Sequence, residues 1–273
     1  MNNFLVIQIK KIISENSETK TFCFQRGLMS KAGQFVMLWV PGIGQKPFSI
    51  TYDNGNEFWL TILQRGQVTR ALFELKAGDY VGIAGPYGTN FSIDPNFDYI
   101  AVAGGYGVAP LRLFAEQAAL VNIRIDFCLG AKNQDSLILV NYLKKIPGLK
   151  LFIATDDGSK GYHGYVTELL PQLLATDHKI KNVRKKKVVV CGPELMGKAA
   201  LDLCNYYHTA CEISIERYIK CGVGVCGQCA VDGLGICLCK EGPVVSRHIA
   251  NQITEFGYYA RDKSGQKYLY EKK

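Results

Sequence analysis

The sequence predicts a chain of three parts: an antiparallel β barrel, an α/β domain with a parallel sheet, and a small cysteine-rich C-terminal module. Three observations predict this class. Short alternating segments fill the first part, apolar runs alternate with stretches of helical spacing in the second, and five of the ten cysteines fall between residues 221 and 239. A chain of 273 residues is long enough for two ordinary domains and a small one.

Six short segments with strand-like composition occupy residues 1–95, which we expect to form the barrel. Turn residues such as Pro41-Gly42 and Asp53-Asn54-Gly55 separate them. Short strands at close spacing favour an antiparallel barrel over a parallel sheet. The expected strands are 4–13, 20–25, 34–40, 48–52, 57–63 and 80–84.

Within the barrel, three short motifs combine a positive charge, a proline and hydroxyl groups. Such residues on adjacent strands can hold a phosphate, fix the backbone and donate to a flavin ring. By itself the pattern also fits an ordinary edge strand that contains a proline. The motifs are Lys46-Pro47-Phe48-Ser49, Leu63-Gln64-Arg65 and Val68-Thr69.

After residue 95 the period changes, and residues 96–210 read as an α/β domain that binds a dinucleotide. The apolar run Tyr99–Ala103 leads into Gly104-Gly105-Tyr106-Gly107-Val108-Ala109-Pro110, and residues 111–121 have helical spacing. Strand, glycine turn and helix together present N–H groups and a helix dipole to a pyrophosphate. Strands at 123–129, 151–155 and 187–191 follow, with helices expected from Asp135, Thr167 and Glu194.

Two loops follow strands of this expected sheet. Ligands of open α/β sheets bind at the carboxyl ends of strands, so both loops should face the site made by the glycine turn. A glycine turn alone is a weak signal of dinucleotide binding, and three loops at one edge strengthen it. The two loops are Thr155-Asp156-Asp157-Gly158 and Cys191-Gly192-Pro193-Glu194-Leu195-Met196.

The cysteine-rich segment reads Cys221-Gly-Val-Gly-Val-Cys226-Gly-Gln-Cys229, followed by Cys237-Leu-Cys239. The spacing C-x4-C-x2-C with a later cysteine matches the plant-type [2Fe–2S] pattern, and the glycines let backbone N–H groups approach the sulfurs. A structural zinc site remains an alternative, although zinc usually takes two close cysteine pairs. Spacing alone leaves the fourth ligand open between Cys237 and Cys239.

Composition argues against other classes of function. The net charge of +8 is spread along the chain, and its densest run, residues 184–187, reads as the solvated start of a strand, so we expect no nucleic-acid partner. The first apolar run is too short for a secretory signal, and no segment suggests a membrane span, so we expect a cytoplasmic protein. The remaining cysteines read as small core residues: Cys23, Cys128, Cys191, Cys204 and Cys211.

The order of these motifs resembles the ferredoxin-reductase superfamily with an appended [2Fe–2S] module. Within it, the chain resembles the electron-transfer subunits of two-subunit, NAD-dependent dihydroorotate dehydrogenases. The most specific parts are Glu216-Arg217-Tyr218 before the cysteines and Cys239-Lys240-Glu241-Gly242-Pro243-Val244, which is similar to the family's C-x-D-G-P-V. The sequence departs from the family at Lys46, where an arginine is usual, and at Val68, where a glycine is usual.

The resemblance implies FAD in the barrel, NAD on the α/β domain, and a [2Fe–2S] cluster held by Cys221, Cys226, Cys229 and Cys239 in a module of residues 211–247, followed by a tail of residues 248–273. It also implies that an FMN-containing catalytic subunit oxidises dihydroorotate in pyrimidine biosynthesis, that electrons pass through the cluster and FAD to NAD⁺, and that the two subunit types form a heterotetramer. This chain then needs no catalytic residue of its own.

Two alternatives stay open. The first is another FAD and [2Fe–2S] subunit, such as that of NADH-dependent ferredoxin:NADP oxidoreductase, which carries an Asp where this chain has Cys221. The second is a zinc-stapled binding protein.

Overall fold

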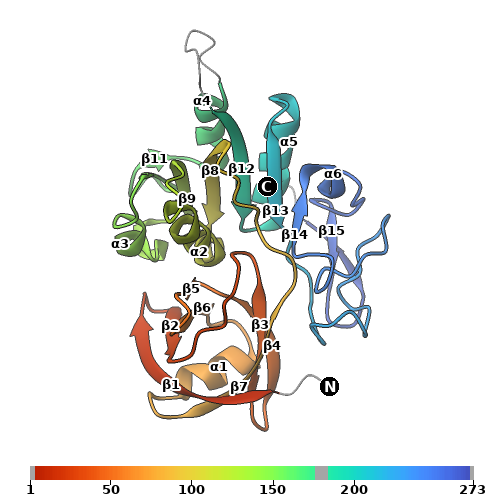
Figure 1. The fold of residues 1–273 in the computed structure, drawn as a ribbon. Helices are drawn as coiled ribbons and strands as arrows, with labels where there is room; N and C mark the ends of the chain where they lie inside the picture. Colours follow the sequence, from red (N-terminus) through yellow and green to blue (C-terminus); the bar gives the residue numbers. More distant parts are fainter. Residues whose placement is uncertain (1–3, 176–183, 271–273) are drawn as a thin grey trace.

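The computed structural model of the chain describes residues 4–175 and 184–270. Figure 1 shows the N-terminal barrel, the α/β domain beside it, and a C-terminal part along one flank of the α/β sheet. The barrel sheet has seven antiparallel strands in the order β4-β3-β7-β1-β2-β6-β5. Their bounds are β1 Leu5–Ser14, β2 Thr19–Phe24, β3 Phe35–Val40, β4 Gly44–Ser49, β5 Tyr52–Asp53, β6 Phe58–Leu63 and β7 Tyr80–Tyr87.

The predicted antiparallel barrel is confirmed, but two of its local features differ from the prediction. The strand expected at 48–52 is instead β4, which ends at Ser49. Because β4 is an edge strand, it accommodates Pro47, which has no N–H to donate to a ladder. Residues 67–74 form a helix, α1 (Gln67–Glu74), that packs Val68 and Leu72 into the barrel.

The second sheet has the order β11-β10-β9-β8-β12-β13-β14 and is parallel except for β14. The predicted parallel sheet is therefore confirmed. Its strands are β8 Phe97–Gly104, β9 Ile125–Ala131, β10 Leu149–Thr155, β11 Tyr162–His163, β12 Lys185–Cys191, β13 Ala210–Ser214 and β14 Val244–Ser246. Its helices are α2 Val108–Ala119, α3 Val140–Leu143, α4 Leu170–Leu174, α5 Glu194–Tyr206 and α6 Arg247–Ala250, with 3-10 turns at Gly105–Gly107, Gln134–Ser136 and Val166–Leu169.

The helix predicted from Asp135 is wrong. A short 3-10 turn forms there, because the Ser136 N–H and hydroxyl both donate to Asn133 Oδ1 and close the turn locally. Leu137 is then extended and Leu139 has a φ of 60°, so helical geometry resumes only at Val140.

The basic run at 184–187 is solvated only in its first half: Arg184 and Lys185, where β12 begins, are exposed, whereas Lys186 and Lys187 are half-buried. Lys187 is only 15% exposed and lies 2.7 Å from Glu212 Oε1 on β13. The Lys186 ammonium donates to the carbonyl of Leu173. Partners on neighbouring elements therefore neutralise or hold these charges beside the sheet.

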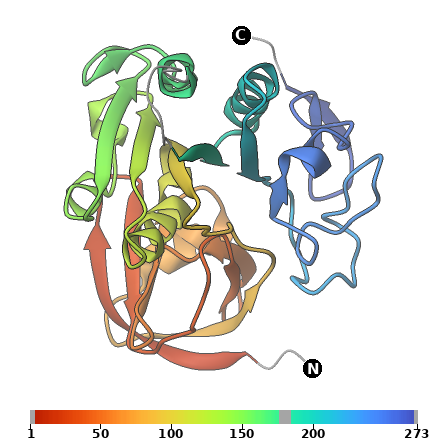
Figure 2. The same ribbon diagram turned by 45° about the horizontal axis from the view of Figure 1, so that its top comes forward.

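The α/β sheet continues past the boundary predicted at residue 210, because β13 and β14 pair within it. The residues between these two strands form the cysteine-rich part, where one isolated bridge joins Ala230 and Cys237. The tail adds a hairpin of β15 Tyr259–Arg261 and β16 Lys267–Leu269. Figures 1 and 2 both show this C-terminal part beside β13 and β14. In the described residues, no helix is long and apolar enough to cross a membrane.

Candidate cofactor sites

The predicted cluster cysteines lie in two neighbouring loops, residues 221–229 and 237–241, and backbone N–H groups approach their sulfurs. The N–H of Gly224 lies 3.0 Å from Cys239 Sγ, and that of Cys239 lies 3.3 Å from Cys229 Sγ. Gly222 and Gly224 have φ of 79° and 77°, a conformation that side chains other than glycine rarely adopt. The glycines therefore let the first loop fold over the cysteine of the second.

The acidity of these thiols differs with their surroundings. Burial raises the pKa of Cys221, but N–H groups of Val223, Cys226 and Val225 and the Cys226 thiol outweigh burial and lower it to about 6. Burial, followed by the neighbouring Cys229 thiol, raises the pKa of Cys239 to about 12. Cys221 is thus prepared as a thiolate ligand, whereas Cys239 must lose its proton when a metal binds.

The donor set fits a [2Fe–2S] cluster, which takes four cysteines shared between two irons. Each iron of such a cluster takes two of the four cysteines, and in the described part of the chain no three His, Cys, Asp or Glu side chains converge on one position, as a single-metal site would require. Cys237 also contacts Cys229, so five thiols lie in this region. Cys239 differs from Cys237 because its sulfur accepts the Gly224 N–H from the first loop. This contact supports the prediction of Cys239 as the fourth ligand.

The barrel contacts the segment that precedes the cysteines, residues 216–220, which we call the junction segment. Lys46 Nζ lies 3.2 Å from the Tyr218 hydroxyl and 4.2 Å from the centre of its ring. Gln45 Nε2, next to it on β4, donates to the Lys220 carbonyl at 2.9 Å. The predicted flavin strand and the cysteine module therefore meet directly.

The other predicted flavin residues lie where β6 leads into α1. Leu63 ends β6, Gln64 and Arg65 follow it, and Val68 and Thr69 are in the first turn of α1. The Thr69 hydroxyl accepts the N–H groups of Arg65 at 2.8 Å and Gly66 at 2.9 Å. Thr69 therefore shapes the turn that opens the helix, and a helix N-terminus favours phosphate.

The glycine turn and the 191–196 loop are packed against each other, as the adjacent strands β8 and β12 require. A Cβ on Gly107 would lie 2.1 Å from the Cys191 carbonyl oxygen, and one on Gly104 would lie 2.5 Å from Met196 Sδ. Only glycine allows this approach. Gly105 precedes α2, whose first turn holds Val108 and Pro110, while Gly192 and Pro193 precede α5.

Two residues predicted to bind the nucleotide, Thr155 and Glu194, already have hydrogen-bond partners within the protein. The buried Thr155 hydroxyl bonds the N–H and the carbonyl of Lys160 at 2.9 Å, so it holds its own loop together; exposed Asp156 follows it. Strand β9 separates β10 from β8, so this loop is roughly 10 Å from the glycine turn. Both carboxylate oxygens of Glu194 are engaged, by Arg217 and by the Gly257 N–H.

The sequence pattern missed Tyr106 as a contact residue, although it lies inside the glycine turn. Its hydroxyl donates to Glu216 Oε2 at 2.6 Å. Burial, followed by the Glu216 charge, raises the pKa of Tyr106 well above its usual range. The junction segment therefore contacts the α/β domain through Glu216 and the barrel through Tyr218.

Comparisons with known proteins agree with this arrangement. The family model described as the iron-sulfur cluster binding domain of dihydroorotate dehydrogenase B matches residues 216–249, and the oxidoreductase NAD-binding domain matches residues 101–202. A protein of Methanocaldococcus jannaschii, called probable dihydroorotate dehydrogenase B (NAD(+)), electron transfer subunit, is 40% identical over 99% of this chain and 100% of its own length. A protein of Methanocella arvoryzae with the same name is 37% identical over 95% and 96%.

Among solved structures, the chain is similar to that of NADH-dependent reduced ferredoxin-NADP oxidoreductase. The TM-score is 0.78, the sequence identity is 24%, and the match covers 91% of this chain and 90% of the other. This likeness shows that the fold is shared.

Proposed function

Because the chain belongs to the family of dihydroorotate dehydrogenase B electron transfer subunits, we propose that it connects dihydroorotate oxidation in a separate, FMN-containing catalytic subunit to the reduction of NAD⁺. The complex is cytoplasmic and contains both subunit types as a heterotetramer. The observation that carries the proposal is the junction segment, which joins the cysteine loops to the barrel at Lys46 and to the glycine turn at Tyr106.

The residues present fit the cofactors that the family implies. Cys221, Cys226, Cys229 and Cys239 would hold a [2Fe–2S] cluster, the β4 and α1 motifs would hold FAD, and the glycine turn with the 191–196 loop would hold NAD(H). When bound, a flavin exchanges hydride with nicotinamide and single electrons with an iron–sulfur centre, so it connects the two. The chain's own residues bind, orient and insulate these groups.

Individual side chains have distinct tasks in this proposal. The Lys46 ammonium supplies a point charge for a phosphate, and Tyr218 holds it in place by its ring and hydroxyl. Backbone N–H groups at the start of α2 would donate to a pyrophosphate, and Gly104 and Gly107 let the glycine turn and the 191–196 loop approach each other closely. Cys191 beside them is half-buried, and desolvation raises its pKa to about 12, so it stays a neutral thiol.

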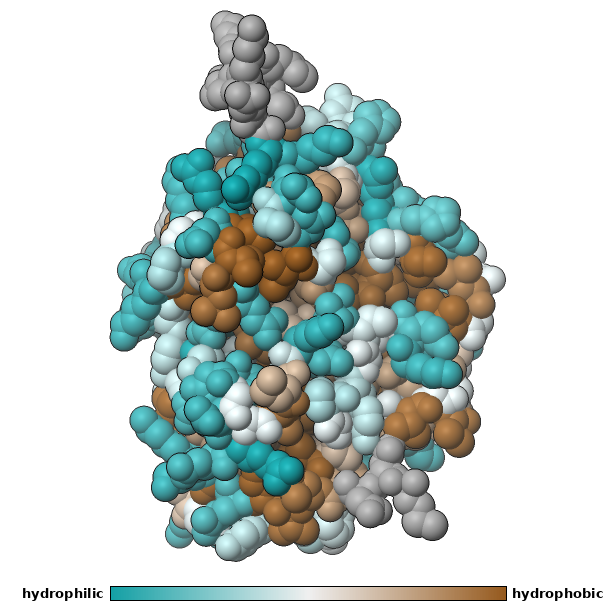
Figure 3. All heavy atoms as spheres, in the orientation of Figure 1, coloured by the Kyte–Doolittle hydropathy of each residue, from teal (hydrophilic) through white to brown (hydrophobic). Residues whose placement is uncertain are grey.

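The catalytic partner would cover the surface of the first cysteine loop. Val225 in this loop is 84% exposed and Val223 is 36% exposed. Figure 3 shows hydrophobic side chains on the surface of the C-terminal flank. Exposed apolar side chains beside a redox site favour a protein contact.

The proposal is tested by assaying this chain alone and then together with the catalytic subunit. We expect the isolated holo chain to reduce artificial acceptors with NADH but not to oxidise dihydroorotate. Adding the FMN-containing subunit should create dihydroorotate:NAD⁺ activity, which should disappear when the cluster is removed. Dihydroorotate oxidation by the lone chain would overturn the proposal, and activity with a ferredoxin but not with that subunit would favour a ferredoxin-linked reductase.

A further inference from the structure

One surface of the barrel sheet is apolar although it points away from the barrel core. On β3, Leu38 faces the core and is fully buried, so its neighbours Met37 and Trp39 face outward. Trp39 pairs with Gly82 on β7, and Gly82 pairs with Val6 on β1. Directly paired residues share one face of a sheet, so this row lies on the outside of the barrel.

The uncovered part of this surface, which we call the outer barrel face, consists of Phe4, Val6, Trp39 and Tyr80. A Cβ on Gly82 would lie 2.8 Å from Trp39 Cε3 and 3.2 Å from Phe4 Cδ1, so both rings lie over that glycine. The two ring centres are 5.9 Å apart. Val6 is 62% exposed, and Tyr80, two residues before Gly82 on β7, is 58% exposed. The face therefore presents aromatic and aliphatic side chains to solvent.

The cysteine module covers the other end of the same surface. Met37 pairs with Ala84, and both are buried in a hydrophobic cluster that includes Cys239. A Cβ on Gly222 of the first cysteine loop would lie 2.9 Å from Met37 Cγ, so this loop rests on β3. Phe4 packs against the same hydrophobic cluster. The outer barrel face therefore continues directly from the first cysteine loop.

The exposed valines of the first cysteine loop are too few for a stable contact between subunits. Such a contact buries about 800 Å² or more on each partner, from roughly 20–30 residues. Val223 and Val225 are the exposed large apolar side chains of this loop. A subunit that docks over them must therefore extend onto neighbouring surface, and the outer barrel face is apolar surface that adjoins the loop.

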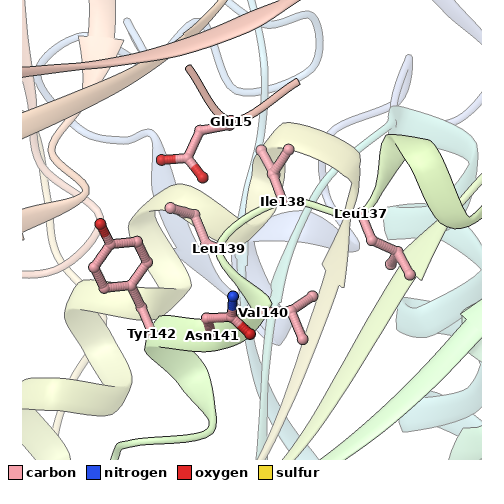
Figure 4. Close-up of a pocket in the computed structure, with 7 residues that line it drawn as sticks. All are labelled: Glu15, Leu137, Ile138, Leu139, Val140, Asn141 and Tyr142. Carbon is pink, nitrogen blue, oxygen red and sulfur yellow. The ribbon is translucent and has the colours of Figure 1, made fainter. Parts of the chain in front are cut away.

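The shape of the outer barrel face fits a protein better than a small ligand, because small-molecule sites are concave. Two pockets of the protein lie elsewhere. The pocket in Figure 4, of about 150 Å³, is lined by Glu15 and residues 137–142. A larger pocket, of about 410 Å³, is lined by side chains that include those of β5, β6, α2 and α3. Neither lining includes a residue of the outer barrel face.

We propose that the outer barrel face is the second half of the docking surface for the catalytic subunit, which covers the first cysteine loop and the barrel together. This inference rests on the proposed function, which makes that subunit the partner. The surface of the subunit that meets the outer barrel face is apolar as well, because burying apolar area on both sides stabilises the contact. Docking on two elements of the chain fixes how the cysteine loop faces its partner.

Surface plasmon resonance of the holo chain on the FMN-containing subunit tests the proposal with Val6→Lys and Tyr80→Lys. A lysine at either position would be buried without a counter-charge, so each variant should raise Kd at least about tenfold. Both positions are exposed in the isolated chain, so each variant should keep its FAD, its iron and its activity with NADH and an artificial acceptor. The matched control is Leu269→Lys at an exposed leucine of the tail hairpin, which should leave Kd unchanged.

The outcomes separate this inference from the proposed function. If either Val6→Lys or Tyr80→Lys binds as the unmodified chain does, or if Leu269→Lys weakens binding equally, the inference fails while the proposed function stands. We expect the isolated chain to sediment as a monomer; a dimer that Val6→Lys dissociates would show that the face binds a second copy instead. If the unmodified holo chain forms no complex with the catalytic subunit, the proposed function fails and this inference fails with it.

Discussion

Arg217 is a guanidinium shared by two buried carboxylates, and its replacement gives the sharpest test of how the C-terminal part is held. Glu194 Oε2 lies 2.6 Å from Arg217 Nη1, and Glu255 Oε1 lies 3.5 Å from its Nε. All three side chains are at most 5% exposed. Arg217→Met leaves both carboxylates buried without a counter-charge, so we expect a loss of about 3–5 kcal/mol of local stability, as for other broken buried pairs.

Two backbone amides report this loss directly, because their acceptors are the carboxylates themselves. The Gly257 N–H donates to Glu194 Oε1 at 3.1 Å and the Asp232 N–H to Glu255 Oε2 at 2.7 Å. Hydrogen exchange measures local opening where a cofactor-bound chain does not unfold in two states. In Arg217→Met both amides should exchange about a hundredfold faster or more.

The matched control is Glu255→Gln. Glutamine keeps an oxygen for the Asp232 N–H and leaves one carboxylate for one guanidinium, so exchange of that amide should rise less than about tenfold. If Arg217→Met leaves the Gly257 amide as protected as in the unmodified protein, the network does not hold the C-terminal part and the reasoning fails.

Three further predictions concern the cofactors and the thiols. Cys239→Ser should lose the cluster while Cys237→Ser keeps it, as judged by iron and acid-labile sulfide content; the reverse result would show that Cys237 is the ligand. Lys46→Ala should weaken FAD binding by about 1.5–3 kcal/mol, the scale of a charged hydrogen bond, whereas Lys46→Arg should keep or tighten it. If the alanine variant retains FAD as well as the unmodified protein does, Lys46 does not contact the cofactor. Burial raises the pKa of Cys23 to about 11 and that of Cys128 to about 12, so both thiols stay protonated at pH 8. Both should therefore resist iodoacetamide until the pH approaches those values or the chain unfolds. Peptide mass spectrometry measures the labelling, and rapid labelling of either thiol in the folded protein at pH 8 would contradict their burial.

Local periodicity and spacing predicted much of the fold, because the strands, turns and cysteine loops depend on residues that are close in sequence. The strands of both sheets, the glycine turn after β8 and the C-x4-C-x2-C loop all depend on residues close in sequence. The same reasoning failed where a side chain ends a pattern early, as Asn133 does by capping the turn before Leu137. It also failed at Lys187, whose partner Glu212 lies on a different strand.

The contacts of the candidate site were harder to predict, since they join residues far apart in sequence. Tyr106 meets Glu216 and Lys46 meets Tyr218 only because the two domains and the C-terminal part come together. Because Glu194 lies in the loop that follows β12, the sequence predicted that it contacts a nucleotide. Its buried pairing with Arg217 depends on the junction segment, which no local pattern places there.

The C-terminal tail explains how the short stretch between Cys229 and Cys239 is held in place. That stretch has one isolated β-bridge of its own. Asp232 within it is hydrogen-bonded to side chains of the tail hairpin. The Tyr259 hydroxyl donates to Asp232 Oδ2 at 2.5 Å and Arg261 Nη2 lies 2.9 Å from the same oxygen. These bonds and the nearby Arg261 and Lys267 charges lower the pKa of Asp232 to about 2, so its carboxylate stays charged at neutral pH. A loop with little secondary structure thus holds its last cysteine in place because a separate part of the chain, the tail, fixes its middle.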